Sequence, residues 1–333
     1  MGGNIGAKTG GSTLAVPMNP TFDDIRAAAE RIAPFAHRTP IMTSATLDRE
    51  LGAQVFFKCE NLQKVGAFKA RGALNTVLSL SEDEAAGGVI THSSGNHAAA
   101  LAYAAGIRGI PCTVVMPDDA PGVKVTAVRG YGAEIVFCKQ NEREAVCDRE
   151  MRARRAVLVH PFDDPRVVAG QGTAALELFE DVPDLDFVVA PVGGGGLLSG
   201  TTLAATSLRP GIRVVGAEPE AVDDAYRSLQ TGVRQPRVPN PTTWADGLLT
   251  GLGEIAFAIL TEAATEVVTI TEEALLAAAL FHLQRMKLVV EPSGAAGLAA
   301  VRVLADEVRG LRVGVIISGG NTDFRWLEAA LAA

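Results

Sequence analysis

The sequence of 333 residues has few aromatic side chains, few cysteines and an excess of acidic over basic groups. Aromatic residues make up 5% of the chain, and the four cysteines at positions 59, 112, 138 and 147 form no CxxC pair. This spacing excludes zinc-finger motifs and is typical of reduced thiols in a cytoplasmic protein. Lys and Arg total 30 against 38 for Asp and Glu, which gives a net charge of −8. Without a basic stripe, nucleic acid is not an expected partner.

The sequence also lacks the signals of secretion and of membrane insertion. Residues 1–18 contain no sustained apolar segment, so we expect a flexible tail rather than a signal peptide. Two uncharged stretches, Ala86–Ile107 and Phe187–Leu208, carry Gly, Ser, Thr, Asn or Pro near their centres, which a lipid-exposed helix disfavours. We interpret each stretch as a buried strand, a loop and a buried helix of a protein without a membrane partner.

Short β-branched segments alternate with Ala-rich helical segments along most of the chain. Predicted strands cover 54–58, 88–91, 112–116, 134–137, 156–159, 186–191, 212–217 and 311–317. Predicted helices cover 97–106, 122–130, 141–154, 167–180, 196–208, 272–286 and 294–308, and a further helix begins after Thr21 as its N-cap. Because the strands are continuously apolar, they indicate parallel sheets covered by helices on both faces, and therefore an α/β protein.

Three predicted strands end in polar, glycine-containing loops. These loops are His92–His97 (HSSGNH), Gly193–Gly196 (GGGG) and Ser318–Asn321 (SGGN). Ligands of open α/β sheets bind beyond the carboxyl ends of the strands, so the loops are candidate binding segments. The four glycines before a predicted helix would let main-chain N–H groups converge on a phosphate, with a tight turn as the alternative. The loop at 93–97 would hold a carboxylate at a helix start or merely cap that helix.

Lysine is scarce, with seven in the chain, and one of them lies among small and apolar residues. Lys69 stands in GAFKARGA, where burial would favour its neutral, nucleophilic amine, whereas a lysine on a helix surface is the default alternative. Glu218 stands where a dinucleotide-binding fold places its ribose-binding acid. The G-x-G-x-x-G pattern of that fold fails, however, because Ser199 occupies the place of the third glycine.

Together, GAFKARGALN around Lys69 and the loops SSGNH, GGGG and SGGN resemble the fold-type II pyridoxal-phosphate (PLP) enzymes of the serine racemase and serine/threonine dehydratase family. The similarity extends from Thr39 to Leu327 and includes AGQGTAALEL and RMKLVVEPSGAAGLAAV. It implies a tryptophan-synthase-β-like fold with two open, mainly parallel sheets. A discontinuous large domain of residues 19–81 and 159–333 would bind PLP, and a small mobile domain of residues 82–158 would carry the substrate loop.

The resemblance also implies roles for the matched residues in binding the cofactor. Lys69 would bind PLP covalently and act as a base, and Phe68 would pack against the ring. Asn96 would donate a hydrogen bond to the 3-oxygen, and Ser318 would face the pyridine nitrogen. The phosphate would be held by Gly193, Gly194, Gly195 and Gly196. A neutral hydroxyl at Ser318 leaves the ring nitrogen less protonated than a carboxylate would, which favours expulsion of a β-leaving group.

Further roles implied by the resemblance concern the substrate and a metal ion. The substrate carboxylate would be held by Ser93, Ser94, Asn96 and His97. Ser94 would in addition deliver a proton from the face opposite Lys69, which makes racemisation a secondary activity. A divalent cation, Mg²⁺ or else Ca²⁺ or Mn²⁺, would be bound by Glu218, Asp224 and the carbonyl of Val222. A solvated acidic helix start is the alternative interpretation of these acids.

The implied protein is a cytoplasmic homodimer or higher homo-oligomer that converts L-serine or L-threonine to a 2-oxo acid and ammonia. Because the chain ends at Ala333, soon after SGGN, we expect no regulatory domain. One alternative is a 3-hydroxyaspartate dehydratase, for which Arg143 is the nearest candidate to meet the side-chain acid. A β-replacement enzyme such as a cysteine synthase is disfavoured, because Ala70 follows Lys69 where those enzymes carry Asp. A nicotinamide-dependent oxidoreductase built on Gly193–Gly196 and Glu218 is the third alternative.

Overall fold

The computed structural model describes residues 19–93, 95–120 and 122–332, and the predicted tail 1–18 lies outside them. The larger sheet contains β1 (Ile41–Met42), β2 (Gln54–Cys59), β7 (Phe187–Pro191), β8 (Arg213–Pro219), β9 (Glu266–Ile270) and β10 (Arg312–Ile317). The smaller sheet contains β3 (Val89–Thr91), β4 (Cys112–Pro117), β5 (Glu134–Cys138) and β6 (Val157–Leu158).

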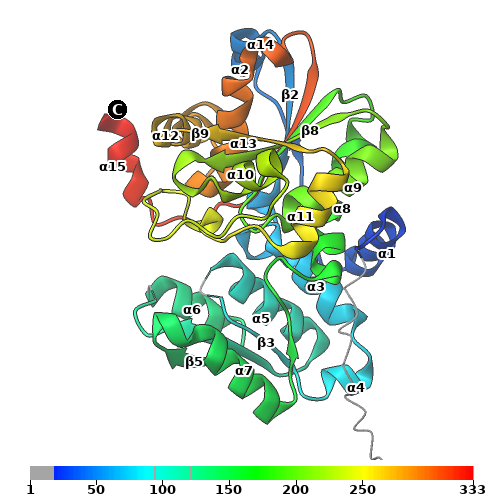
Figure 1. Cartoon of the computed structure of the whole chain (residues 1–333), viewed down its shortest axis with the longest axis vertical. Coiled ribbons are helices and arrows are strands. Elements are labelled where there is room, and N and C mark those ends of the chain that lie inside the picture. The colour runs from blue at the N-terminus through cyan, green and yellow to red at the C-terminus, as the bar shows by residue number, and fades with distance from the viewer. Residues whose placement is uncertain (1–18, 94, 121, 333) are drawn as a thin grey trace, which may run out of the picture.

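The helices connect the strands in chain order (Figure 1). The helices before β7 are α1 (Phe22–Ile32), α2 (Ala45–Leu51), α3 (Lys69–Ser79), α4 (Glu82–Ala85), α5 (Asn96–Arg108), α6 (Gly122–Gly130), α7 (Arg143–Arg154) and α8 (Pro165–Asp181). The helices after β7 are α9 (Gly196–Leu208), α10 (Asp224–Thr231), α11 (Glu254–Glu262), α12 (Glu272–Phe281), α13 (Pro292–Val303), α14 (Ala305–Val308) and α15 (Arg325–Ala332).

The sheet orders show that the chain leaves the larger sheet, builds the smaller one and returns. The larger sheet has the order β1-β2-β10-β7-β8-β9 and the smaller one β5-β4-β3-β6. Every neighbouring pair is parallel except β1 and β2. The predicted α/β class with two mainly parallel sheets is therefore confirmed.

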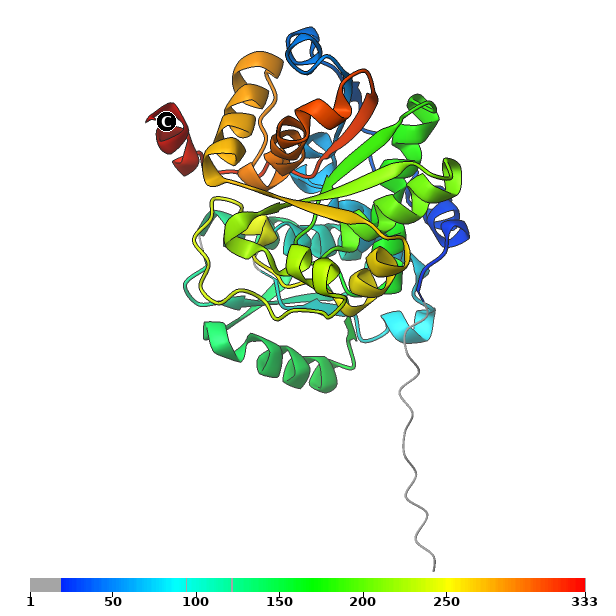
Figure 2. The same cartoon turned by 45° about the horizontal axis from the view of Figure 1, so that its top comes forward.

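Both faces of the larger sheet are buried, as continuously apolar strands require. Along β10, Val313, Val315 and Ile317 pack with α12 and α13, whereas Ile316 packs with α8 and α9 on the opposite face. Figures 1 and 2 show the orange helices α12 and α13 on one side of this sheet and the green helices α8 and α9 on the other. This double cover leaves the strand ends and the loops that follow them as the places where a ligand can bind.

Most predicted elements are present, and the exceptions have local causes. Thr21 caps α1 in a capping box with Asp24. The strands β1 and β9 were not predicted, because β1 has two residues and β9 (EVVTI) is short and interrupted by polar side chains. The helix predicted for 272–286 ends at Phe281 and continues as a π-helix over His282–Met286. Among the described residues, no helix is both long and apolar enough to cross a membrane.

Candidate active site

Lys69 is the first residue of α3, and the loop before it is joined to the loop after β10. The N–H of Phe68 donates a hydrogen bond to the carbonyl of Ser318 over 3.0 Å, and Ala67 pairs with Gly319 in a β-bridge. Because β2 and β10 are neighbouring parallel strands, the loops beyond their carboxyl ends lie side by side. The structure thus brings together two residues that are far apart in the sequence, Lys69 and the buried Ser318.

The Lys69 amine is partly buried and has no carboxylate partner among the described residues. Its Nζ donates a hydrogen bond to the carbonyl of Pro161 over 2.8 Å and lies 4.9 Å from the centre of the Phe68 ring. Burial lowers the pKa of Lys69 to about 8, so about a tenth of the amine is neutral at pH 7, far more than for an ordinary lysine. A neutral amine is the form that attacks an aldehyde carbon.

The four glycines lie between β7 and α9. Their lack of side chains leaves space beside the main chain that the Cβ atoms of other residues would occupy. Gly193 and Gly195 have φ angles of 55° and 83°, which favour glycine. A Cβ at Gly194 would overlap the ring of Phe162. Among the described residues, no acceptor is found for the main-chain N–H groups of Gly193, Gly194 and Gly196. These N–H groups, with the positive end of α9, fit a phosphate.

Asn96, the first residue of α5, makes hydrogen bonds in two directions. Its Nδ2 donates to Oε1 of Glu291 over 2.9 Å, and its Oδ1 accepts from Nδ2 of Asn321 over 2.9 Å. One amide hydrogen of Asn96 therefore remains for a ligand. The main-chain N–H groups of Asn96 and His97 have no acceptor among the described residues, so the start of α5 fits a carboxylate.

The other predicted carboxylate-binding residues differ in their surroundings. Ser93 Oγ accepts a hydrogen bond from the N–H of Gly95 over 3.3 Å. The His97 ring is 2% exposed and contacts the Val159 carbonyl through Nε2 over 3.0 Å. Burial and the nearby Lys69 lower the pKa of His97 to about 3, so its ring is neutral and offers no charge to an anion. Ser94 lies outside the described residues.

Glu291 and Pro161 were not singled out from the sequence. Glu291 precedes α13 and carries a carboxyl whose pKa is raised to about 8, mainly by burial. The signal in the sequence was an isolated acid in the apolar segment LVVEPSG. Pro161 acts through a main-chain carbonyl, which no residue type reveals.

A cavity of about 740 Å³ adjoins Asn96 and Glu291. Its walls come from α5 and α6 on one side and from segments 243–247 and 321–326 on the other. Between these sides, Lys124 Nζ and Asp246 Oδ2 form an ion pair of 2.9 Å. The cavity therefore lies between helices of the smaller sheet and loops of the larger one.

Glu218 and Asp224 lie together at the carboxyl end of β8. Glu218 accepts hydrogen bonds from the N–H groups of Ala225 and Tyr226, and Asp224 accepts one from Leu252. Burial raises the pKa of Glu218 to about 8, and the neighbouring Asp224 adds to this effect. Two buried acids without a basic partner fit a cation, although no cluster of three or more metal-binding side chains occurs among the described residues.

A family model described as "Pyridoxal-phosphate dependent enzyme" matches residues 32–319. The chain belongs to the family of PLP-dependent enzymes. The match covers Lys69, the four glycines and Ser318. Membership in the PLP family leaves the nicotinamide-dependent alternative without support, since Glu218 instead binds the start of α10 through its carboxylate.

Relatives within the PLP family cover nearly the whole chain. The chain is 48% identical to a serine racemase of Dictyostelium discoideum, over 93% of this chain and 98% of the relative. It is also 48% identical to a β-hydroxyaspartate dehydratase of Paracoccus denitrificans, over 91% of this chain and 97% of the relative. The crystal structure of a T.th. threonine deaminase superposes with a TM-score of 0.88 at 46% identity, covering 92% of this chain and 99% of that one.

Proposed function

We propose that this chain eliminates water from L-serine or L-threonine with PLP, giving pyruvate or 2-oxobutyrate and ammonia, and that it racemises serine as a second activity. The observation that carries the proposal is the Lys69 amine, whose pKa is about 8. It bonds the carbonyl of Pro161, next to the Phe162 ring that lies against Gly194, and the preceding Phe68 bonds Ser318. The serine racemase and the threonine deaminase among its relatives support this substrate class.

Each residue of the site has a defined task in this proposal. Lys69 would hold the cofactor through its aldehyde and would take the proton from Cα on its own face, and the Pro161 carbonyl orients its amine. The glycine N–H groups bind the phosphate, and the start of α5 binds the substrate carboxylate. Bound PLP would supply an electron-withdrawing ring conjugated to the substrate nitrogen. Ser318 would give that ring a neutral partner, which favours loss of the β-hydroxyl.

The proposal is tested by the absorbance and the products of the purified protein. We expect a visible absorbance band from lysine-linked PLP, and 2-oxo acid and ammonia in equal amounts from L-serine. Lys69→Ala should lose both the band and the activity, whereas Lys139→Ala, at an exposed ion pair with Asp118, should retain both. Lysine-linked cofactor in the Lys69 variant would refute the assignment. Ser94→Ala should abolish formation of D-serine, measured by chiral chromatography, while elimination continues.

A second candidate substrate is 3-hydroxyaspartate, because of Arg143. This arginine begins α7 and makes no ion pair with any described residue. The pKa of His92 is lowered first by burial and second by the positive charge of Arg143, so Arg143 lies near His92. The His92 ring in turn contacts the ring of His160, next to Pro161. The guanidinium would therefore meet a second carboxylate of the substrate. If so, Arg143→Met should raise KM for L-threo-3-hydroxyaspartate at least tenfold and leave KM for L-serine within about twofold.

We also propose that Glu218, Asp224 and the Val222 carbonyl hold a divalent cation such as Mg²⁺. The two carboxylates lie close together, and the Val222 carbonyl has no hydrogen-bond donor among the described residues. Oxygen ligands of this kind suit Mg²⁺ or Ca²⁺. Adding Mg²⁺ after treatment with a chelator should raise the melting temperature of the wild type and not that of Glu218→Gln.

Three features of the molecule as a whole belong to the same proposal. Residues 82–158 would move as a small domain over the cavity, with the Lys124–Asp246 ion pair stabilising the closed form. Leu62 and Val289 are exposed and lie close together, because Asn61 donates a hydrogen bond to the Val289 carbonyl. These two apolar side chains support a homodimer, which light scattering would test. The four buried, unpaired cysteines support a cytoplasmic location.

A further inference from the structure

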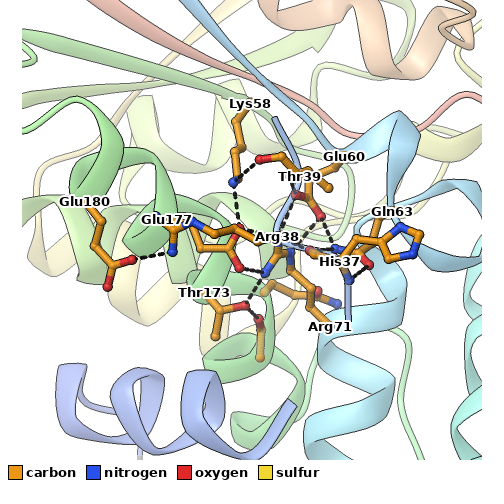
Figure 3. A network of polar contacts seen from close by, with 12 residues as sticks. His37, Arg38, Thr39, Lys58, Glu60, Gln63, Arg71, Thr173, Glu177 and Glu180 are labelled. Atoms are coloured by element: carbon orange, nitrogen blue, oxygen red, sulfur yellow. Dashed lines mark hydrogen bonds and ion pairs between the residues drawn. The ribbon is translucent and has the colours of Figure 1, made fainter. Parts of the chain in front are cut away.

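Four charged side chains, one of them from the first turn of α3, form a network of ion pairs (Figure 3). We call them the Arg71 cluster, and its members are Lys58, Glu60, Arg71 and Glu177. The side chains of Lys58, Glu60 and Arg71 are 0% exposed, and that of Glu177 is 16% exposed. Two positive and two negative groups make the cluster neutral as a whole.

Arg71 is bonded through every N–H of its guanidinium. Nε and Nη2 donate to the two carboxylate oxygens of Glu60 over 2.7 and 2.8 Å. Nη1 and Nη2 donate to the two oxygens of Glu177 over 2.7 and 2.8 Å, and Nη1 also reaches Thr173 over 3.1 Å. Such a double fork fixes the plane of the guanidinium, which a lysine cannot reproduce.

The remaining members hold the two carboxylates in place. Lys58 Nζ lies 2.6 Å from Glu177 and donates to the Thr39 carbonyl over 2.7 Å. The Thr39 hydroxyl donates to Glu60 over 2.5 Å. Burying four ions gives no clear gain in stability over apolar side chains of the same volume, because desolvation offsets their attraction. Fixing a geometry is a role that apolar side chains would not fill.

The cluster joins the start of α3, which carries Lys69, to two other segments of the chain. Glu60 directly follows β2, Arg71 is the third residue of α3, and Glu177 lies in α8. Helix α3 begins without a side-chain cap, so its first turn lacks the usual fixation. Residues 69 and 71 are about 200° apart around a helix, so Arg71 is anchored on the side away from Lys69.

We propose that Arg71 is a positioning residue for Lys69. Its two carboxylate partners fix the rotation of the first turn of α3 and thereby hold the Lys69 amine against the Pro161 carbonyl. This inference rests on the proposed function of Lys69. A displacement of the amine by about 1 Å would slow the reaction by on the order of 100-fold.

The decisive variant is Arg71→Lys, which keeps the charge and removes the double fork. We expect kcat to fall about 10- to 100-fold while KM changes less than about threefold. In protein freed of cofactor, covalent capture of added PLP, followed by its visible absorbance, should slow at least about fivefold. The pH midpoint of that absorbance should shift as well. The matched control is Arg38→Lys. Arg38 is exposed and pairs with Glu180 and Asp181, which lie on α8, the helix that also carries Glu177.

The outcomes separate this inference from the proposed function. An Arg71→Lys protein with wild-type kcat, capture rate and pH midpoint, but a lower melting temperature, would show a merely structural role and overturn the inference. If that variant does not fold, Glu177→Gln, which leaves the Glu60 fork intact, should give a smaller change in the same three quantities, and wild-type values would overturn it. A wild-type protein that captures no PLP would instead refute the proposed function.

Discussion

The amide of Asn96 donates a hydrogen bond of 2.9 Å to a buried carboxyl, that of Glu291, across 195 residues of sequence. The contact joins the start of α5, beside the smaller sheet, to the start of α13, on the larger one. Burial, followed by the charge of Asp246, raises the pKa of Glu291 to about 8. The carboxyl is therefore protonated at neutral pH.

Replacing Glu291 should change how stability depends on pH. An unfolded Glu releases its proton near pH 4.3, whereas the folded chain retains it to about pH 8, so the contribution of Glu291 to stability falls as pH rises between these values. Glu291→Gln cannot release a proton. In denaturant unfolding, the free energy of unfolding of the variant should rise relative to that of the wild type by up to about 1.4 kcal/mol per pH unit from pH 5 to 8. Above pH 8 this difference should stay constant. A difference that stays constant from about pH 5 to 8 as well would contradict the prediction.

His282 should destabilise the protein, increasingly so at acid pH. Its ring is 0% exposed, and neither ring nitrogen has a hydrogen-bond partner among the described residues. Burial lowers the pKa of His282 to about 3. Between pH 6.5 and 3 only the unfolded chain takes up the proton, so the free energy of unfolding decreases as the pH is lowered. His282→Leu should raise the free energy of unfolding by about 1–3 kcal/mol at pH 7 and by more at pH 5, measured by urea unfolding. An equal gain at both values would mean that the ring is protonated in the folded state.

A methyl group in the glycine loop should disturb cofactor binding. The Cβ of Gly194→Ala would overlap the ring of Phe162. We expect at least tenfold weaker retention of PLP, measured by absorbance after dialysis, and partial recovery when Phe162→Ala is added. Gly130→Ala at the end of α6 is the control, because its Cβ meets nothing within 4 Å and should leave retention unchanged. Full retention in the Gly194 variant would mean that the Phe162 ring moves aside freely.

Val65 is held in a backbone conformation that a β-branched residue disfavours. Its φ is 56°, and its carbonyl accepts a hydrogen bond of 2.7 Å from Asn321. Asparagine tolerates this region, so Val65→Asn should raise the free energy of unfolding by about 1 kcal/mol, measured by thermal unfolding. Val233→Asn, at a position 62% exposed, should have no effect. A lower melting temperature for the Val65 variant would mean that the lost apolar contacts outweigh the relieved strain.

The sequence predicted the strand ends and their loops, because continuous apolar segments and glycine runs have a direct physical cause. The four glycines and the loop at Ser318 were found this way, whereas Lys69 was found as a scarce lysine among small and apolar residues, and the role of Ser318 came from the family resemblance. Glu291 was missed because its partner Asn96 is set by tertiary packing, and the Pro161 carbonyl because a main-chain group has no residue signature. The Arg71 cluster was missed for the same reason as Glu291, since Glu60 and Glu177 converge only in the folded chain.

The pairing of β2 with β10 has a consequence for how the protein is made. Residues 54–59 pair with residues 312–317, so the first strand leaves the ribosome long before its neighbour exists. At ~5–20 residues per second, the delay is roughly 13 to 50 s. The four-stranded sheet, whose strands all lie between Val89 and Leu158, can form during this time. The Ser318 carbonyl that bonds the residue before Lys69 is made long after Lys69 itself, so this contact beside the Lys69 amine forms only after β2 and β10 have paired.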